Sequence, residues 1–130
     1  FNKENGGLLH EIVADVFGEN TPAALVSGPS FAKEVAADLP TAIAIASTQS
    51  EFATQLAMIL HSDRFRAYTN DDLIGVEVGG AIKNVMAIAA GIADGLGFGA
   101  NTRAALITRG MSEIIRLGVQ LGGKQTRLWA

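Results

Sequence analysis

Hydrophobic residues in the first seventy positions follow two alternating spacings. Apolar residues between positions 8 and 17 recur at helical spacing and stop at Gly18, which predicts an amphipathic helix. Short apolar runs at 23–26 and 41–46 and an alternating stretch at 64–69 predict three strands. Between the strands we expect a short helix at 30–37 and a second one opened by a capping box at 48–51. This alternation is typical of an α/β fold.

After Asn70, Asp71 and Asp72, which can cap a helix, the pattern becomes purely helical. One helix carries an apolar stripe at positions 78, 82, 85, 89 and 92, and another runs from about residue 101 to Gly122 and Gly123. We therefore expect a domain boundary near residue 70, with an α/β part at 1–70 and an all-α part at 71–130. The chain lacks a starting Met and a helix-ending residue at its other end, so we expect an internal segment of a longer protein.

Composition excludes several kinds of protein. The chain has ten basic and thirteen acidic residues, scattered to a net charge of −3, which argues against nucleic-acid binding. The absence of cysteine excludes disulfides and thiolate zinc sites and favours a reducing compartment, the cytoplasm. No uninterrupted apolar run reaches the ~18 residues of a membrane span. His10 and His61 have no second ligand at metal spacing, so we expect solvated or capping roles and no metal site.

Two glycine motifs resemble phosphate-binding loops, but their context argues against that role. Residues 95–100 fit G-x-G-x-x-A, yet they follow a long helix and not a strand, so we interpret them as a loop between helices. Residues 118–124 fit G-x-x-x-x-G-K, but Gln125 replaces the Ser or Thr that would hold magnesium. We expect a helix end and a loop there.

The turn at residues 27–32 joins a predicted strand to a predicted helix, the place where ligands gather in open α/β sheets. Gly28 would let the backbone approach a ligand, and Ser30 stands where a helix N-cap could meet an anion. From the residues alone, a simple tight turn with a serine cap is the leading alternative.

Lys83 projects from a helical stripe of small residues. Val76, Gly80, Ala87 and Gly91 share its side of the predicted helix, so another helix or a ligand can come close. A lysine there is a candidate for proton transfer. Spacing alone favours a lysine that extends to solvent from a tightly packed helix.

Three segments together resemble the bacterial-type NAD(P)-dependent glycerol-3-phosphate dehydrogenase family. They are SGPSFA at 27–32 followed by Glu34 and Val35, GVEVGGAIKNV at 75–85, and AAGIADGLGFGANTRAAL at 89–106. The resemblance runs through essentially the whole chain with matching order and spacing.

The resemblance implies the end of a Rossmann-type dinucleotide-binding domain followed by the start of an all-helical substrate domain. By position, Lys83 matches the catalytic lysine, Gly28, Ser30 and Lys83 match substrate-binding positions, and Ala32 matches a cofactor-contacting position. The implied reaction is NAD(P)H-dependent reversible reduction of dihydroxyacetone phosphate to sn-glycerol 3-phosphate, by a homodimer in the full-length enzyme. Asn84 and Glu77 lie on a nearby helical side and are candidates for orienting Lys83, with a purely structural role as the alternative.

The family's glycine-rich dinucleotide loop and further substrate ligands would lie outside this chain, so we expect these 130 residues alone to be inactive. Two other functions remain open. Related β-hydroxyacid dehydrogenases also carry a helical-domain lysine, but their pattern places Asn four residues later, where this chain has Ala87. A non-catalytic helical dimerisation or binding module is the second alternative.

Overall fold

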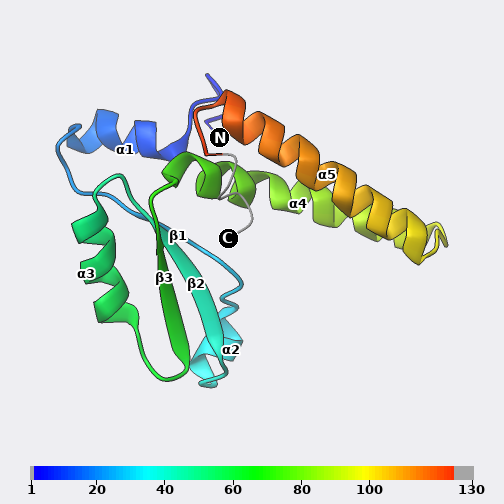
Figure 1. Cartoon of the computed structure of the whole chain (residues 1–130), viewed down its shortest axis with the longest axis horizontal. Helices are drawn as coiled ribbons and strands as arrows, with labels where there is room; N and C mark the ends of the chain where they lie inside the picture. Colours follow the sequence, from blue (N-terminus) through cyan, green and yellow to red (C-terminus); the bar gives the residue numbers. More distant parts are fainter. Residues whose placement is uncertain (1, 125–130) are drawn as a thin grey trace.

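The computed structural model describes residues 2–124, and its elements alternate as expected from the sequence (Figure 1). Helices and strands take turns as far as residue 70, and two long helices follow. In order they are α1 (Leu9–Phe17), β1 (Leu25–Ser27), α2 (Ala32–Ala36), β2 (Thr41–Ala46), α3 (Ser50–Leu60), β3 (Phe65–Asn70), α4 (Leu73–Gly95) and α5 (Ala100–Gln120).

The sheet has the strand order β1-β2-β3, with β1 antiparallel and β3 parallel to β2. Helix α3 connects the two parallel strands and covers one face of the sheet, where Ile43, Ile45 and Ala53 are buried together. This is a parallel strand-helix-strand unit, in which the crossover helix buries its apolar side on the strands it joins.

The amino end of α4 packs on the sheet through a second apolar cluster, in which Ala46, Leu73 and Val76 are buried and Leu25 is partly buried. The register pairs Ala46 with Asn70, so the two side chains lie on the same side of the sheet. Helix α4 thus begins against β1 and β2 and then leaves the sheet (Figure 1).

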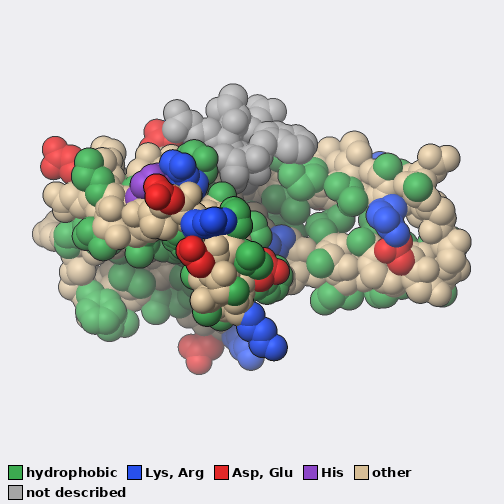
Figure 2. Space-filling model, turned by 90° about the horizontal axis from the view of Figure 1, so that it is seen from below, with side chains coloured by type: hydrophobic (Ala, Val, Ile, Leu, Met, Phe, Trp, Pro, Cys, Tyr) green, Lys and Arg blue, Asp and Glu red, His purple; other side chains and the backbone are tan. Residues whose placement is uncertain are grey.

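Helices α4 and α5 form a hairpin that extends away from the sheet (Figure 1). They approach closely at Gly110, where an added Cβ would lie 1.9 Å from Cε of Met86. Arg103 and Asp94 form an ion pair of 2.7 Å near the connecting loop at 96–99. The 95–100 motif thus joins two helices as expected, with Gly95 the last residue of α4 and Ala100 the first of α5. The α4 side chains of Val85, Ile88 and Ile92 are exposed, and hydrophobic side chains follow the hairpin in Figure 2.

The helix caps differ from those expected. Phe31, not Ser30, precedes α2 as its N-cap residue, and it gives no side-chain cap. The capping box at 48–51 is also wrong, because α3 begins at Ser50 and its N-cap is Gln49. Ser47 supplies the local acceptor, with Oγ 3.1 Å from the Gln49 backbone N–H. The expected cap at Asp72 is confirmed, since its carboxylate accepts from Gly75 N–H at 3.0 Å.

Helix α4 is long and apolar enough to cross a membrane by length and composition alone. Core helices of water-soluble proteins meet the same criterion. Its first turns are buried on the sheet, where Leu73, Val76 and Val78 belong to the core.

Candidate active site

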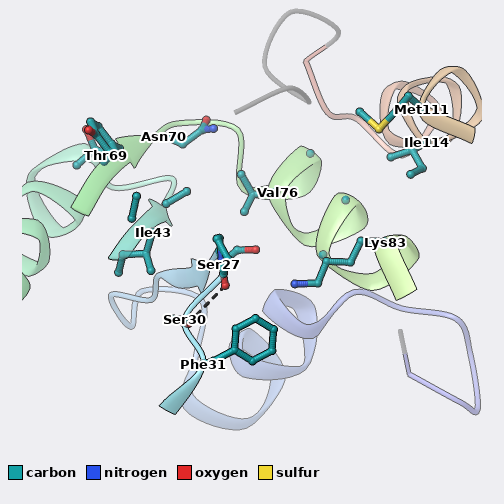
Figure 3. Close-up of a pocket in the computed structure, with 18 residues that line it drawn as sticks. Ser27, Ser30, Phe31, Ile43, Thr69, Asn70, Val76, Lys83, Met111 and Ile114 are labelled. Atoms are coloured by element: carbon teal, nitrogen blue, oxygen red, sulfur yellow. Dashed lines mark hydrogen bonds between the residues drawn. The ribbon is translucent and has the colours of Figure 1, made fainter. Parts of the chain in front are cut away.

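A cavity of about 810 Å³ lies between the turn after β1, the carboxyl end of β3 and the first half of α4. Figure 3 shows these elements surrounding it, with α5 closing one side. The residues that line it are Ser27, Gly28, Pro29, Ser30, Phe31, Ala42, Ile43, Ala44, Tyr68, Thr69, Asn70, Gly75, Val76, Gly79, Gly80, Lys83, Met111 and Ile114. A largely apolar cavity with a few converging polar groups is the usual form of a small-molecule site.

The turn after β1 is held by its own backbone geometry. Gly28 has a φ of 141°, and an added Cβ would lie 3.0 Å from both the Ala42 carbonyl oxygen and the Ile43 Cα. Glycine is therefore required because the turn packs against β2, whatever its role toward a ligand. Ser30 Oγ donates a long hydrogen bond of 3.4 Å to the Gly28 carbonyl.

Lys83 faces this turn from α4. In Figure 3 its nitrogen points across the cavity toward Ser27 and Ser30. The side chain forms no hydrogen bond or ion pair with residues 2–124, so its three N–H donors are available to a ligand. The sequence expected Lys83, Gly28 and Ser30 at one site, and the structure brings all three to one cavity.

The small-residue stripe around Lys83 opens to the cavity over its first part only. Gly79 has no atom within 4 Å of an added Cβ, and at Gly80 the nearest is Ser27 Oγ at 3.5 Å. Both glycines line the cavity, whereas Ala87 and Gly91 do not. This stretch of α4 presents bare backbone to whatever occupies the space.

Several lining residues were not singled out from the sequence. Thr69 and Asn70 end β3, and Met111 and Ile114 come from α5. Asn70 had been considered only as a helix cap. The carboxyl end of a strand parallel to its neighbour is the signal that could have pointed to it.

Of the two roles considered for Glu77, orienting Lys83 or a purely structural one, the structure supports the structural role. Its buried carboxylate accepts from the backbone N–H groups of Leu9 and His10, and its Oε2 lies 2.6 Å from His10 Nδ1. Helix α4 places Glu77 toward α1 and Lys83 toward the cavity. The six-residue step between them turns the helix by ~600° at ~100° per residue, which leaves the two side chains ~120° apart around its axis.

The remaining expected site residues have these places. The His10 side chain is 29% exposed and pairs with the buried Glu77 carboxylate. His61 directly follows α3, with Nε2 3.3 Å from Arg66. Ala32 begins α2 directly after Phe31 and is not among the residues that line the cavity, so its cofactor role stays a prediction. Within residues 2–124 no cluster of three or more metal-ligating side chains was found.

The parallel strand-helix-strand unit, followed by two long helices, identifies the class of fold. It is the end of a Rossmann-type dinucleotide-binding fold followed by an all-helical part. Residues 1–53 match the family profile described as NAD-dependent glycerol-3-phosphate dehydrogenase N-terminus, and residues 72–130 match the corresponding C-terminus profile. The chain belongs to the NAD-dependent glycerol-3-phosphate dehydrogenase family.

Individual relatives agree with this family. The chain is 61% identical over 123 residues to a Nitrosococcus oceani protein named glycerol-3-phosphate dehydrogenase [NAD(P)+], covering 95% of this chain and 36% of the relative. It is 58% identical to the Aeromonas salmonicida protein of the same name, covering 92% and 36%. This chain therefore spans little more than a third of the curated relatives it matches.

Solved structures share the fold. The crystal structure of the Coxiella burnetii glycerol-3-phosphate dehydrogenase superposes with a TM-score of 0.91 at 54% identity, over 98% of this chain and 39% of that one. The Plasmodium falciparum enzyme gives a TM-score of 0.82 at 26% identity, over 91% and 32%.

Proposed function

We propose that the complete protein carrying this chain reversibly reduces dihydroxyacetone phosphate to sn-glycerol 3-phosphate with NAD(P)H, for glycerophospholipid synthesis. The observation that carries the proposal is that Lys83 of α4 shares one cavity with Gly28 and Ser30 of the turn after β1. The names of the Nitrosococcus and Aeromonas relatives support this reaction. The division into a Rossmann-type part at 1–70 and a helical part at 71–130 is part of the proposal, supported by the separate matches at 1–53 and 72–130.

The cavity suits the flat ring of a nicotinamide. Its walls are largely apolar, and Gly79 and Gly80 leave open space beside α4. Ala32 follows the turn at the start of α2 and is the proposed cofactor contact of this chain. When bound, NAD(P)H supplies the hydride.

Lys83 is the proposed acid and base. As an ammonium it holds the ketone oxygen by a charge-assisted hydrogen bond and gives its proton to that oxygen as the alcohol forms. In the reverse direction the neutral amine removes the proton. Lys83 thereby stabilises the charge that develops on oxygen in the transition state. Gly28 and Ser30, on the wall that faces Lys83, hold the substrate.

The two alternatives are weaker. A β-hydroxyacid dehydrogenase is disfavoured by Ala87, which stands where that family has Asn, and by the names of the relatives. A non-catalytic module would give no role to Lys83, which faces the cavity without a partner among residues 2–124.

The proposal extends to the cellular location, the oligomeric state and the relation to membranes. We propose a cytoplasmic homodimer without a membrane span. The burial of the first turns of α4 on the sheet and the charged Glu77 and Lys83 within that helix support the last of these points, the absence of a span. Light scattering and fractionation of cells expressing the complete protein test these points.

The reaction is tested in a full-length enzyme that carries this segment, for example the Nitrosococcus relative with its 123 matching residues replaced by this chain. We expect oxidation of NADH or NADPH that depends on dihydroxyacetone phosphate, and none with small β-oxo acids. Reduction of an oxo acid and not of the triose phosphate would favour the β-hydroxyacid alternative.

A further inference from the structure

Asn70 is a largely buried residue in the Lys83 cavity whose amide nitrogen has no hydrogen-bond partner among residues 2–124. It ends β3, lines the cavity and is only 9% exposed. Its side chain extends from the strand toward the start of α4 in Figure 3. No side-chain nitrogen or oxygen of the described residues is both fully buried and without a partner, so the unpartnered amide nitrogen of Asn70 keeps accessible surface that a ligand can reach.

The orientation of the amide is fixed by the backbone. Oδ1 of Asn70 accepts from the Asp72 backbone N–H at 2.8 Å, which identifies that end of the amide as the oxygen. The other end is therefore Nδ2 with its two N–H donors. Nδ2 forms no hydrogen bond with any of residues 2–124.

We propose that Nδ2 of Asn70 donates a hydrogen bond to an oxygen of the ligand in the Lys83 cavity. The proposal rests on the proposed function and adds a binding residue to it. Leu73 follows Asn70 closely, and the ten residues from Leu73 to Lys83 advance α4 by ~15 Å, so Asn70 serves a different part of the ligand from the reacting ketone.

The surroundings of Asn70 select an uncharged oxygen. The neighbouring Asp72 is 3% exposed, and its carboxylate accepts from Gly75 N–H and from Lys124 N–H at 2.9 Å. A negative charge beside the amide disfavours a phosphate there. Two uncharged acceptors among the proposed ligands are the substrate hydroxyl and the carboxamide oxygen of the nicotinamide.

Asn70→Asp in the full-length enzyme tests the proposal. The new carboxylate keeps an oxygen to accept from Asp72 N–H but replaces the donor by a second acceptor. We expect a rise of about tenfold to a hundredfold in the KM for dihydroxyacetone phosphate, if the hydroxyl is the partner, or in the Kd of NAD(P)H, if it is the carboxamide. In either case kcat should change less than the affected constant.

Two further variants separate binding from folding. Asn70→Ser keeps a short acceptor for Asp72 N–H and loses the reach of Nδ2, so the same constant should rise if Asn70→Asp does not fold. Asn20→Asp makes the same chemical change at an exposed turn outside the cavity and should leave both constants unchanged.

Both constants within about twofold of wild type in a folded Asn70 variant would overturn the proposal while leaving the dehydrogenase assignment intact. The assignment itself fails separately, if the unsubstituted enzyme does not reduce dihydroxyacetone phosphate.

Discussion

Nδ1 of His10 lies 2.6 Å from Oε2 of Glu77, and this contact ties the start of α1 to a buried turn of α4. The Glu77 carboxylate, 7% exposed, also accepts from the backbone N–H groups of Leu9 and His10. One side chain of the helical part thus satisfies three donors at the amino end of α1. The contact explains an acidic residue inside an otherwise apolar stretch of α4.

Glu77→Ala should therefore destabilise the protein. Three donors lose their acceptor, and each buried unsatisfied group costs ~1–3 kcal/mol, so we expect a total loss of at least about 2 kcal/mol in the free energy of unfolding. Urea unfolding measures it. Glu113→Ala is the control, because Glu113 is half exposed and within the described part of the chain pairs with Arg116 alone, and it should cost less than about 1 kcal/mol. Equal losses for the two variants would contradict the buried role of Glu77.

Lys83→Met should lower kcat strongly and leave the fold intact. The methionine keeps much of the apolar stem and deletes the ammonium, so we expect kcat to fall ~10²–10⁴-fold or more with little change in Tm or cofactor affinity. Steady-state kinetics, a melting curve and a cofactor titration measure the three quantities. Lys3→Met, at an exposed position, is the control. A folded Lys83→Met enzyme with kcat within about threefold of wild type would make Lys83 a packing residue.

Gly79→Ala should stabilise the protein and impair binding. Alanine in a helix interior is worth ~0.5–1 kcal/mol over glycine, and no atom lies within 4 Å of the new methyl group. Because that methyl enters the cavity, we expect the KM for dihydroxyacetone phosphate to rise several-fold. Gly91→Ala also meets no atom within 4 Å but does not line the cavity, so it should be stabilising without the rise in KM. An unchanged KM in Gly79→Ala would mean that the ligand does not approach this part of α4.

Gly28→Val, in contrast, is a poor probe of the ligand. A side chain at Gly28 would press on the backbone of β2 and would have to adopt a φ of 141°, so the variant should lose stability as well as affinity.

Asp72→Ala should destabilise the start of α4 and the segment that follows α5. The carboxylate caps α4 at Gly75 and also holds the backbone of Lys124 after α5, so we expect a loss of about 1–3 kcal/mol in the free energy of unfolding. Asp63→Ala removes an exposed carboxylate and should change the stability by less than about 0.5 kcal/mol. A Tm for Asp72→Ala equal to that of Asp63→Ala would show that the cap contributes nothing.

Elements and some site residues could be predicted from local sequence. The helices, the strands and the change of pattern after residue 70 follow from spacing, because a side chain's face is set by the period of its own element. Lys83, Gly28 and Ser30 came from motifs whose order and spacing match one family. The caps at Ser30 and at 48–51 were wrong because each helix begins one residue later than the residue types indicated, with Phe31 and Gln49 as the N-cap residues.

The sequence by itself determined the alternation of helices and strands, the family, and Lys83 as the candidate catalytic residue, because all three depend on residue types at short spacing along the chain. Only the tertiary structure decided which side of α4 each polar residue serves: Glu77 turns to α1 and Lys83 to the cavity. It also placed Asn70 beside that cavity with its oxygen engaged and its nitrogen free of partners among residues 2–124. The contact of Glu77 with α1 and the position of Lys83 opposite the turn after β1 join residues that are distant along the chain. The orientation of the Asn70 amide follows only from its hydrogen-bond partner. Local periodicity does not specify these contacts or this orientation, because the packing of one element on another sets them.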